Sequence, residues 1–527
     1  MSIVNLSSQT LPGVYGQIGF AAGPITGGTS VYSVLLLGNM RQDDAGLALA
    51  NLDGYQVYGP GTQVPMQSTQ DAINLFGSGS PLALAVADFY ALNKQTALYA
   101  CPIRQPVGTA ATYILTITLS GTQTAGSVSL QVGPDAPVIT SIGATDTVTN
   151  IAANMANNIN ASNLLPVIAT STLGVLTLTT VTVGARNNFL RAYAKITSGT
   201  GVVLAVTGGV SGNSVPSFFL NGTGSDSLDL THALNALAVN GQRYYYYVPE
   251  AGADSVDGTS FENVFTSQIL ALAAPPTFLR QRLIGGSVDT LAATQTVAAT
   301  MGSADPRAEI ICLPADECTP FRLATRAAAA YSQAEIPPLS AQDVNFDGFG
   351  NDAQSFASWN VPAPLNGTAL SIISQQQATI TGITPLAVQR GGRTSIVKRV
   401  TNHFFSNGSG TFDGRITDGG KVTICDFFTD DVTTQLVATF PRCLIAADPL
   451  QGNPPAVPGV ATPGLVKQVV QGVINNYASR GLINGANTLA NLQVFIDQNN
   501  PAQIDIVCGL FPNNPLHIVN LQVLQQA

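Results

Sequence analysis

The C-terminal residues 503–527 constrain this chain more than any other stretch. Ile504–Leu510 is rich in β-forming residues, and a turn at Pro512–Pro515 follows it. In His517–Leu524, one strand face is formed by Val519, Leu521 and Val523. Two strands alone are marginal in water and leave a row of unpaired N–H and C=O groups. This ribbon is therefore predicted to need another strand, from its own chain or from a neighbour.

The N-terminal end offers such a strand. Apolar and other residues alternate in Val14–Phe20. Gly16 and Gly19 make this strand flexible and only weakly stable on its own. A loose loop, 21–30, follows it. A tethered strand at one end and a sheet edge at the other predict β-augmentation between subunits. We expect this joint to be carried by Val14, Tyr15, Ile18 and Phe20 together with Ile504, Ile506, Val519, Leu521 and Val523.

The composition points to a chain that buries its surface against copies of itself. Charged residues make up only 10% of the chain, against a usual figure of about 25%. Little charge keeps such copies apart, which favours an assembly. The net charge of −9 argues against a nucleic-acid partner. No run of 18 apolar residues occurs, so no membrane insertion is predicted.

The six cysteines are scattered singly, mostly in apolar runs, and Met1–Asn5 has no secretory pattern. We therefore expect buried free thiols rather than disulfides.

The composition and residue pattern change several times along the chain, and its length fits about three domains. Residues 23–102 read as the first half of an α/β domain, with a glycine-terminated buried strand at Val31–Gly38 and a helix from Pro81. Residues 108–216 are rich in Thr, Val, Ser and Gly, with one helix over Thr147–Ala161 that Asp146 is expected to cap.

Residues 217–364 again alternate between helix and strand patterns. Residues 365–527 resemble 23–102 in pattern, and helices are expected at 393–405 and 465–477. The predicted fold is mixed α/β (α+β) and multidomain. An N-terminal arm strand, 1–22, precedes a split domain, 23–102 with 365–527. Two insertions interrupt that domain: a β-rich one, 108–216, and an α/β one, 217–364.

Motifs for catalysis, cofactors or metals are weak. Asp343–Gly348 matches the start of a calcium loop, but the twelfth position is Gln354 rather than Glu, which favours a simple turn. The three histidines, His232, His403 and His517, have no Cys or His at ligand spacing. The sequence has no G-x-S-x-G elbow and no P-loop. We predict no catalytic, cofactor-binding or metal-binding residues, and no enzyme.

The densest positive cluster comprises Arg390, Arg393, Lys398 and Arg399. We weigh two interpretations: contacts to an acidic partner, facing a tube or another subunit, or a solvated helix face. Acidic candidates within the chain are Asp43-Asp44 and Asp430-Asp431.

Motifs spread over nearly the whole chain resemble the tail sheath proteins of contractile phage tails, of the Mu-like branch. Each motif is weak alone, and their order and spacing carry the resemblance. The motifs are Leu11–Tyr15, Val34–Met40, Phe76-Gly77-x-Gly79-Ser80, Ala185–Asn188, Phe321–Ala329, Ile336–Leu339, Gly382–Thr384, Arg393–Thr401 and the terminal ribbon. The segment after Leu339 departs from the family pattern.

The resemblance implies a structural subunit of the virion, assembled in the host bacterial cytoplasm. Such subunits form stacked hexameric rings around a tail tube and contract to drive it through the host envelope for genome ejection. The implied partners are copies of the chain itself, the tail tube protein, and baseplate and tail terminator proteins. It also implies that the split domain lines the tube and that the 108–216 insertion lies outermost.

An enzyme on the 217–364 segment is disfavoured, because the catalytic motifs are missing. Two other interpretations remain open. One is an outer adhesive or receptor-binding virion protein, although the β-repeats expected of that class are not seen. The other is the sheath of a phage-derived bacterial injection device.

Overall fold

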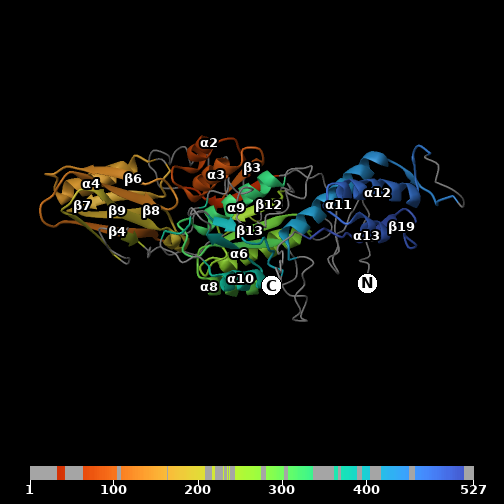
Figure 1. Ribbon diagram of the computed structural model, residues 1–527. Coiled ribbons are helices and arrows are strands. Elements are labelled where there is room, and N and C mark those ends of the chain that lie inside the picture. The colour runs from red at the N-terminus through yellow and green to blue at the C-terminus, as the bar shows by residue number, and fades with distance from the viewer. Residues whose placement is uncertain are drawn as a thin grey trace, which may run out of the picture.

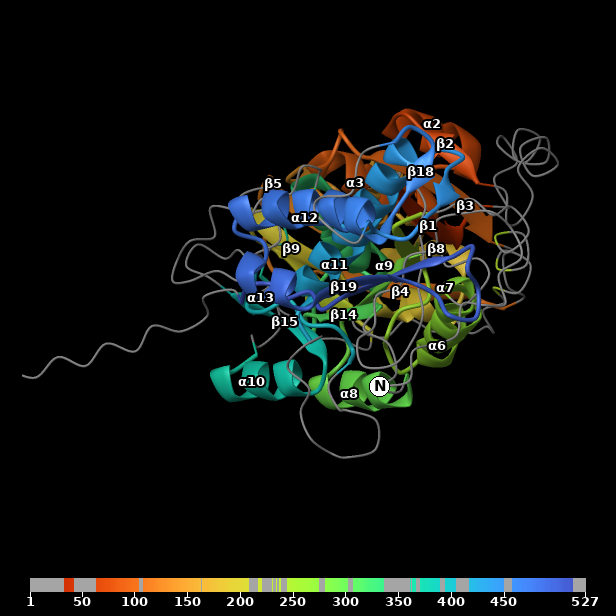
Figure 2. The same ribbon diagram turned by 90° about the vertical axis from the view of Figure 1, so that its right-hand side faces the viewer.

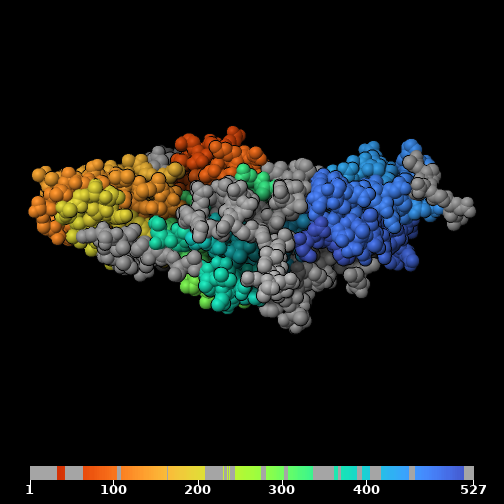
Figure 3. All heavy atoms as spheres, in the orientation of Figure 1, coloured from red at the N-terminus to blue at the C-terminus, as the bar shows by residue number. Residues whose placement is uncertain are grey.

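The structure is a computed structural model, and it shows a mixed α/β fold with several sheets, as predicted. The molecule is elongated: a β-sandwich lies at one end, a large sheet with helices lies in the middle, and a C-terminal helical unit lies at the other end (Figures 1 and 3). The residues described are 33–41, 63–103, 108–162, 164–207, 217–219, 230, 234, 237, 244–273, 280–301, 307–335, 361, 363–365, 370–388, 394–403, 417–449 and 457–514.

The central sheet has eight strands in the order β16-β15-β14-β13-β12-β1-β3-β2. The six inner strands are parallel, and the short edge strands are antiparallel to their neighbours. Their bounds are β1 Ser33–Asn39, β2 Val64–Met66, β3 Ala97–Ile103, β12 Tyr246–Pro249, β13 Arg282–Ser287, β14 Ala308–Cys312, β15 Ile383–Val388 and β16 Thr394–Ile396.

Helices cover both faces of this sheet, which explains why β1 is buried along its whole length. Val34 and Leu36 join one apolar core, and Leu35 and Leu37 join the other. The first core is covered by α2 (Thr69–Phe76), α3 (Pro81–Leu92) and α9 (Pro320–Ala334). The second is covered by α6 (Gly258–Val264), its continuation through η3 (Phe265–Leu270) and α7 (Ala271–Ala273), α8 (Leu291–Thr300) and α10 (Ile372–Ile380) (Figures 1 and 2).

The expected signals set the ends of α2 and α3. The Ser80 hydroxyl accepts a hydrogen bond from the Ala83 N–H, and Pro81 occupies the first helical position. The left-handed Gly77, at φ 88°, ends α2.

The sandwich consists of two four-stranded sheets with α4 (Val148–Asn160) packed against its core. One sheet has the order β10-β4-β8-β7 and the other β11-β9-β5-β6. Their bounds are β4 Ala110–Leu119, β5 Gly126–Val132, β6 Val138–Ile142, β7 Val167–Thr172, β8 Val175–Val183, β9 Ala192–Ser198, β10 Val202–Val206 and β11 Ser217–Phe219, with a short 3₁₀ turn, η2, at Ala185–Phe189.

The predicted cap of α4 was wrong by one residue. Thr147 accepts the hydrogen bond from the Asn150 N–H, whereas the Asp146 carboxylate accepts one from the Gly143 N–H. Asp146 therefore closes the turn before the helix instead of capping it.

The C-terminal unit is built around α11 (Gly419–Thr439) and α12 (Pro463–Ser479), which pack against each other (Figure 2). The helix expected at 465–477 is α12; Thr462 caps it, and the left-handed Gly481 follows its end. The unit is completed by α13 (Gly485–Ala490) and two two-stranded sheets, β17 (Leu444–Ile445) with β18 (Val460–Ala461) and β19 (Leu492–Ile496) with β20 (Ile504–Cys508).

Two predictions fail in the centre of the chain. Residues 394–403 are not helical, because β16 pairs with β15 and the residues after it hydrogen-bond to distant segments. The Thr401 N–H donates to Thr417 O, and the Asn402 N–H donates to Ala308 O. The predicted boundary between 23–102 and 217–364 runs through a single sheet, because β1 pairs with both β3 and β12. Sequence texture does not reveal which distant strands share a sheet.

Candidate functional site

The first candidate site is the strand pair β19–β20, of which β20 belongs to the terminal ribbon at 503–527. Five residue pairs form its antiparallel ladder, from Leu492 opposite Cys508 to Ile496 opposite Ile504. Val494 and Ile506 face inward, opposite each other, against the apolar core. Phe495 and Val507 lie on the other face, each 37% exposed.

Within the described chain, this sheet has only two strands, so each strand has an edge that no third strand covers. The outward face is mixed, because Gln493 lies opposite Val507 and Asp505 lies opposite Phe495. Exposed large apolar residues beside open strand edges are features of a surface that another chain covers. Ile504 and Ile506 lie on a strand, as predicted, and their part in a joint between subunits stays a prediction. Their partner β19 was missed, although Leu492, Val494 and Ile496 alternate with other residues in the sequence.

Most of the other predicted joint and contact residues lie outside the described residues. They are Val14, Tyr15, Ile18, Phe20, Val519, Leu521, Val523, Arg390 and Arg393. The calcium-like stretch 343–354 lies outside them as well.

The prediction for Arg399 was wrong. Its side chain is not on a surface but is 1% exposed, inside the molecule. Its Nε donates to Glu309 Oε2 at 3.0 Å, and a terminal nitrogen pairs with Glu335. Arg399 therefore cannot contact a tube or another subunit. Lys398, next to it, is half-buried.

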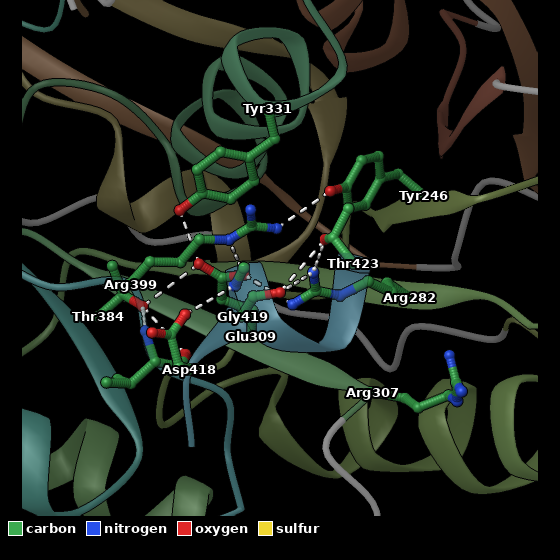
Figure 4. Close-up of polar contacts among 12 residues, drawn as sticks. Tyr246, Arg282, Arg307, Glu309, Tyr331, Thr384, Arg399, Asp418, Gly419 and Thr423 are labelled. Carbon is green, nitrogen blue, oxygen red and sulfur yellow. Dashed lines mark hydrogen bonds and ion pairs between the residues drawn. The ribbon is translucent and has the colours of Figure 1, made fainter. Parts of the chain in front are cut away.

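Arg399 belongs to a buried ion network, the second candidate site (Figure 4). Arg282, on β13, reaches the same Glu309 oxygen at 3.2 Å, so two guanidinium groups share one carboxylate. The Tyr331 hydroxyl on α9 donates to the other oxygen of Glu309 at 2.6 Å. A buried carboxylate keeps its charge only when it is paired and hydrogen-bonded in this way.

Aromatic rings complete the surroundings of the two arginines. The guanidinium carbon of Arg399 lies 3.8 Å from the Tyr331 ring centroid, a cation–π contact. The Tyr246 hydroxyl accepts from Arg399 and contacts Glu335. Burial would lower the pKa of Arg399, but the adjacent Glu335 and Glu309 outweigh it and raise that pKa. Burial also raises the pKa of Tyr331. Around neutral pH, Arg399 is therefore charged and the Tyr331 hydroxyl is protonated.

The network connects the central sheet to α11. Arg282 Nη1 donates to Gly419 O and to the Thr423 hydroxyl, both at 2.9 Å. About one and two turns after Thr423 on α11, Asp426 and Asp430 pair with Arg307 and Arg280. Positions 419, 423, 426 and 430 recur at helical spacing and form one stripe. Asp430, an acidic candidate for the basic cluster at 390–399, pairs with Arg280.

The place where a sheet of this order usually binds ligands is filled by the chain itself. In the order β3-β1-β12, the strand order reverses beside β1, and ligands of such sheets bind beyond the carboxyl ends of the strands at this point. Here Arg186, from η2, pairs with Glu250 at 2.8 Å just after β12. The remaining cavity beside them has a volume of about 30 Å³, against roughly 300–1,000 Å³ for small-molecule sites.

Among the described residues, no group of three or more His, Cys, Asp or Glu side chains is arranged to hold a metal ion. No helix in that part of the chain is long and apolar enough to cross a membrane. All six cysteines are free: four are buried, and Cys443 and Cys508 are half-buried. Neither a protein-family model nor a curated protein matches this chain.

Proposed function

We propose that this chain is the sheath subunit of a contractile tail, which polymerises around a tail tube and shortens to drive the tube through a bacterial envelope. The observation that carries the proposal is the β19–β20 pair, whose open edges and exposed Phe495 and Val507 call for a strand from a neighbouring subunit. The arm residues Val14–Phe20 are our candidate for that strand.

The shape of the molecule supports this function. The sandwich and the C-terminal unit lie at opposite ends of the elongated body (Figure 1). If the C-terminal unit makes the joints and faces the tube, the sandwich lies outermost in the sleeve. Tube, baseplate and terminator proteins are then the other partners, in a virion or in a phage-derived injection device.

The ion network attaches the unit that carries the proposed joint to the central sheet. A polymer that changes its lattice needs strand joints that hold while the subunit bodies repack. Each backbone hydrogen bond in such a joint contributes about 0.5–1.5 kcal/mol. The α11 stripe fixes the unit that carries β19–β20 to the central sheet through Arg282, Arg307 and Arg280.

The same proposal assigns the chain no catalytic role. This assignment is supported by the small volume of the cavity at the Arg186–Glu250 pair and by the ion pairs and hydrogen bonds that engage the described arginines of the network.

Negative-stain electron microscopy of the purified full chain, over a range of salt and protein concentrations, tests the proposed function. We expect hollow striated tubes or stacked rings. Discrete trimers at every condition would instead favour an adhesive virion protein. If only monomers form, the chain is co-expressed with a tube protein; continued absence of sleeves would overturn the proposal.

A further inference from the structure

The sandwich and the C-terminal unit are attached to the central sheet in different ways. Phe427 and Ile474 of the C-terminal unit belong to the same apolar core as Phe89 and Tyr331 of the central part. The sandwich has an apolar core of its own, formed by residues of 111–204. One half-buried apolar residue, Phe189, packs from the sandwich side onto the central core. The sandwich is thus a separately cored body.

Polar contacts hold this body in place. Arg186 pairs with Glu250, as described above. Arg322, on α9, donates two hydrogen bonds to Asp135 of the sandwich, each of 2.8 Å, and also binds Asp88 on α3. The Tyr193 hydroxyl, on β9, donates to Glu317 Oε1. We name these three contacts, Arg186–Glu250, Arg322–Asp135 and Tyr193–Glu317, the latch.

Two adjacent carboxyl groups lie under the latch with incomplete hydrogen bonding. Asp316 and Glu317 are 0% and 1% exposed. Asp316 Oδ1 accepts from the Glu317 N–H at 2.8 Å, and Glu317 Oε1 also accepts from the Leu365 N–H at 2.7 Å. Their other oxygens, Asp316 Oδ2 and Glu317 Oε2, have no hydrogen-bond partner among the described residues. Two adjacent buried carboxylates are energetically unfavourable when both are negatively charged and each has one oxygen without a hydrogen-bond partner.

Other charged and titratable groups surround this pair from each neighbouring element. The cations are on α9 and just before β9, and the remaining groups are a carboxylate on α3, a thiol next to the pair and a phenol on β9. They are Arg322, Arg326, Arg191, Asp88, Cys318 and Tyr193. Arg322 and Arg326 both bind Asp88, so their charge is already partly balanced.

We propose that the latch is proton-sensitive: the sandwich docks firmly on the central sheet while Asp316 carries a proton, and its docking weakens when Asp316 and Glu317 are both charged. The latch belongs to the folded chain, and it operates whether or not the chain polymerises.

The expected direction follows from the buried state of the carboxyl. Burial, with the neighbouring Glu317, raises the pKa of Asp316 from 3.8 to about 7. The docked form therefore binds the proton more tightly than a form in which Asp316 meets water. Docking is strongest below the ordinary aspartate pKa, weakens as pH rises from about 4 to about 7, and then levels off.

Hydrogen–deuterium exchange of the full-length chain measures this directly. Backbone amides of 185–191, in and next to η2, and of 315–318 report on the latch, and amides of α4 in the same sandwich serve as the internal reference. From pH 5 to 8, after correction for intrinsic exchange, we expect protection at the latch relative to α4 to fall at least about tenfold. A constant ratio would overturn the proposal.

Variants separate the carboxyl from other pH effects. In Asp316→Asn the fall with pH should vanish while the latch stays docked, and an undiminished fall would contradict the assignment to Asp316. If Asp316→Asn does not fold, Glu317→Gln, which removes the neighbouring charge, should reduce the fall. Tyr193→Phe is the matched control: it should lower latch protection at every pH and keep the slope.

Discussion

Arg307, just before β14, holds both carboxylate oxygens of Asp426 on α11, at 2.8 and 3.0 Å, and both side chains are buried. The pair ties the C-terminal unit to the central sheet, and the Tyr245 hydroxyl donates to the same carboxylate at 3.1 Å.

Asp426→Ala leaves the Arg307 charge buried without its partner. Breaking a buried pair in this way costs about 3–5 kcal/mol, so we expect a loss of that order in the free energy of unfolding, measured with urea. Gln435→Ala, at an exposed position of the same helix, should stay within about 0.5 kcal/mol. Equal effects of the two substitutions would contradict the role given to the pair.

Gly79 has a left-handed backbone, at φ 72°, and lies against the sandwich. A Cβ added there would lie 2.1 Å from the Leu165 carbonyl oxygen. Gly121 has a similar φ of 75° but nothing within 4 Å of such a Cβ. We expect Gly121→Ala to cost about 1–2 kcal/mol from backbone strain alone. Gly79→Ala should cost clearly more in the same urea titration, because the sandwich must shift. Matching values would show that the contact has no energetic weight.

The thiols should react in three classes. Burial raises the pKa of Cys312 to about 12 and that of Cys508 to about 11, and only the thiolate is nucleophilic. In a thiol titration at pH 8, we expect Cys443 to react first, Cys508 slowly, and the four buried cysteines only after denaturation. Raising the pH should speed up Cys508. Rapid reaction of all six in the native chain would contradict the structure.

The sequence predicted local structure better than the contacts between distant segments. Ser80-Pro81 and Thr462-Pro463 carry helix starts in their own side chains, so α3 and α12 could be placed from the sequence. α11 was missed because its first half is buried almost all round, with apolar residues such as Val422, Ile424 and Phe428 mixed with buried polar ones. No single apolar stripe therefore marks it as a helix in the sequence.

The site was predicted in part for a similar reason. The period-two pattern placed Ile504 and Ile506 on a strand, whereas the ion pairs of Arg399 join residues 64 and 90 positions apart. Charge density along the sequence indicates a surface cluster, and only the folded chain shows that Glu309 and Glu335 surround that arginine.

The outward face of β19–β20 should be needed for assembly and dispensable for folding. Phe495→Lys with Val507→Lys places charges on the proposed covered face, and we expect a stable monomer that forms no polymer by light scattering. Ile139→Lys, on the 62% exposed Ile139 of the sandwich, is the control and should assemble normally. Normal assembly of the double variant would refute the surface assignment.

Deleting residues 1–21 removes the proposed exchanging strand. We expect a folded monomer with unchanged circular dichroism and no polymers in sedimentation, since the open edges of β19–β20 are left uncovered. Polymers like those of the full chain would exclude the arm from the joint.

The most direct test of the account is a cryo-electron microscopy reconstruction of the assembled chain at a resolution that separates strands. The account predicts that β19–β20 is extended to a larger sheet by a strand of a neighbouring subunit, with Phe495 and Val507 covered. A polymer in which both edges of this pair face solvent, with its contacts elsewhere, would contradict it.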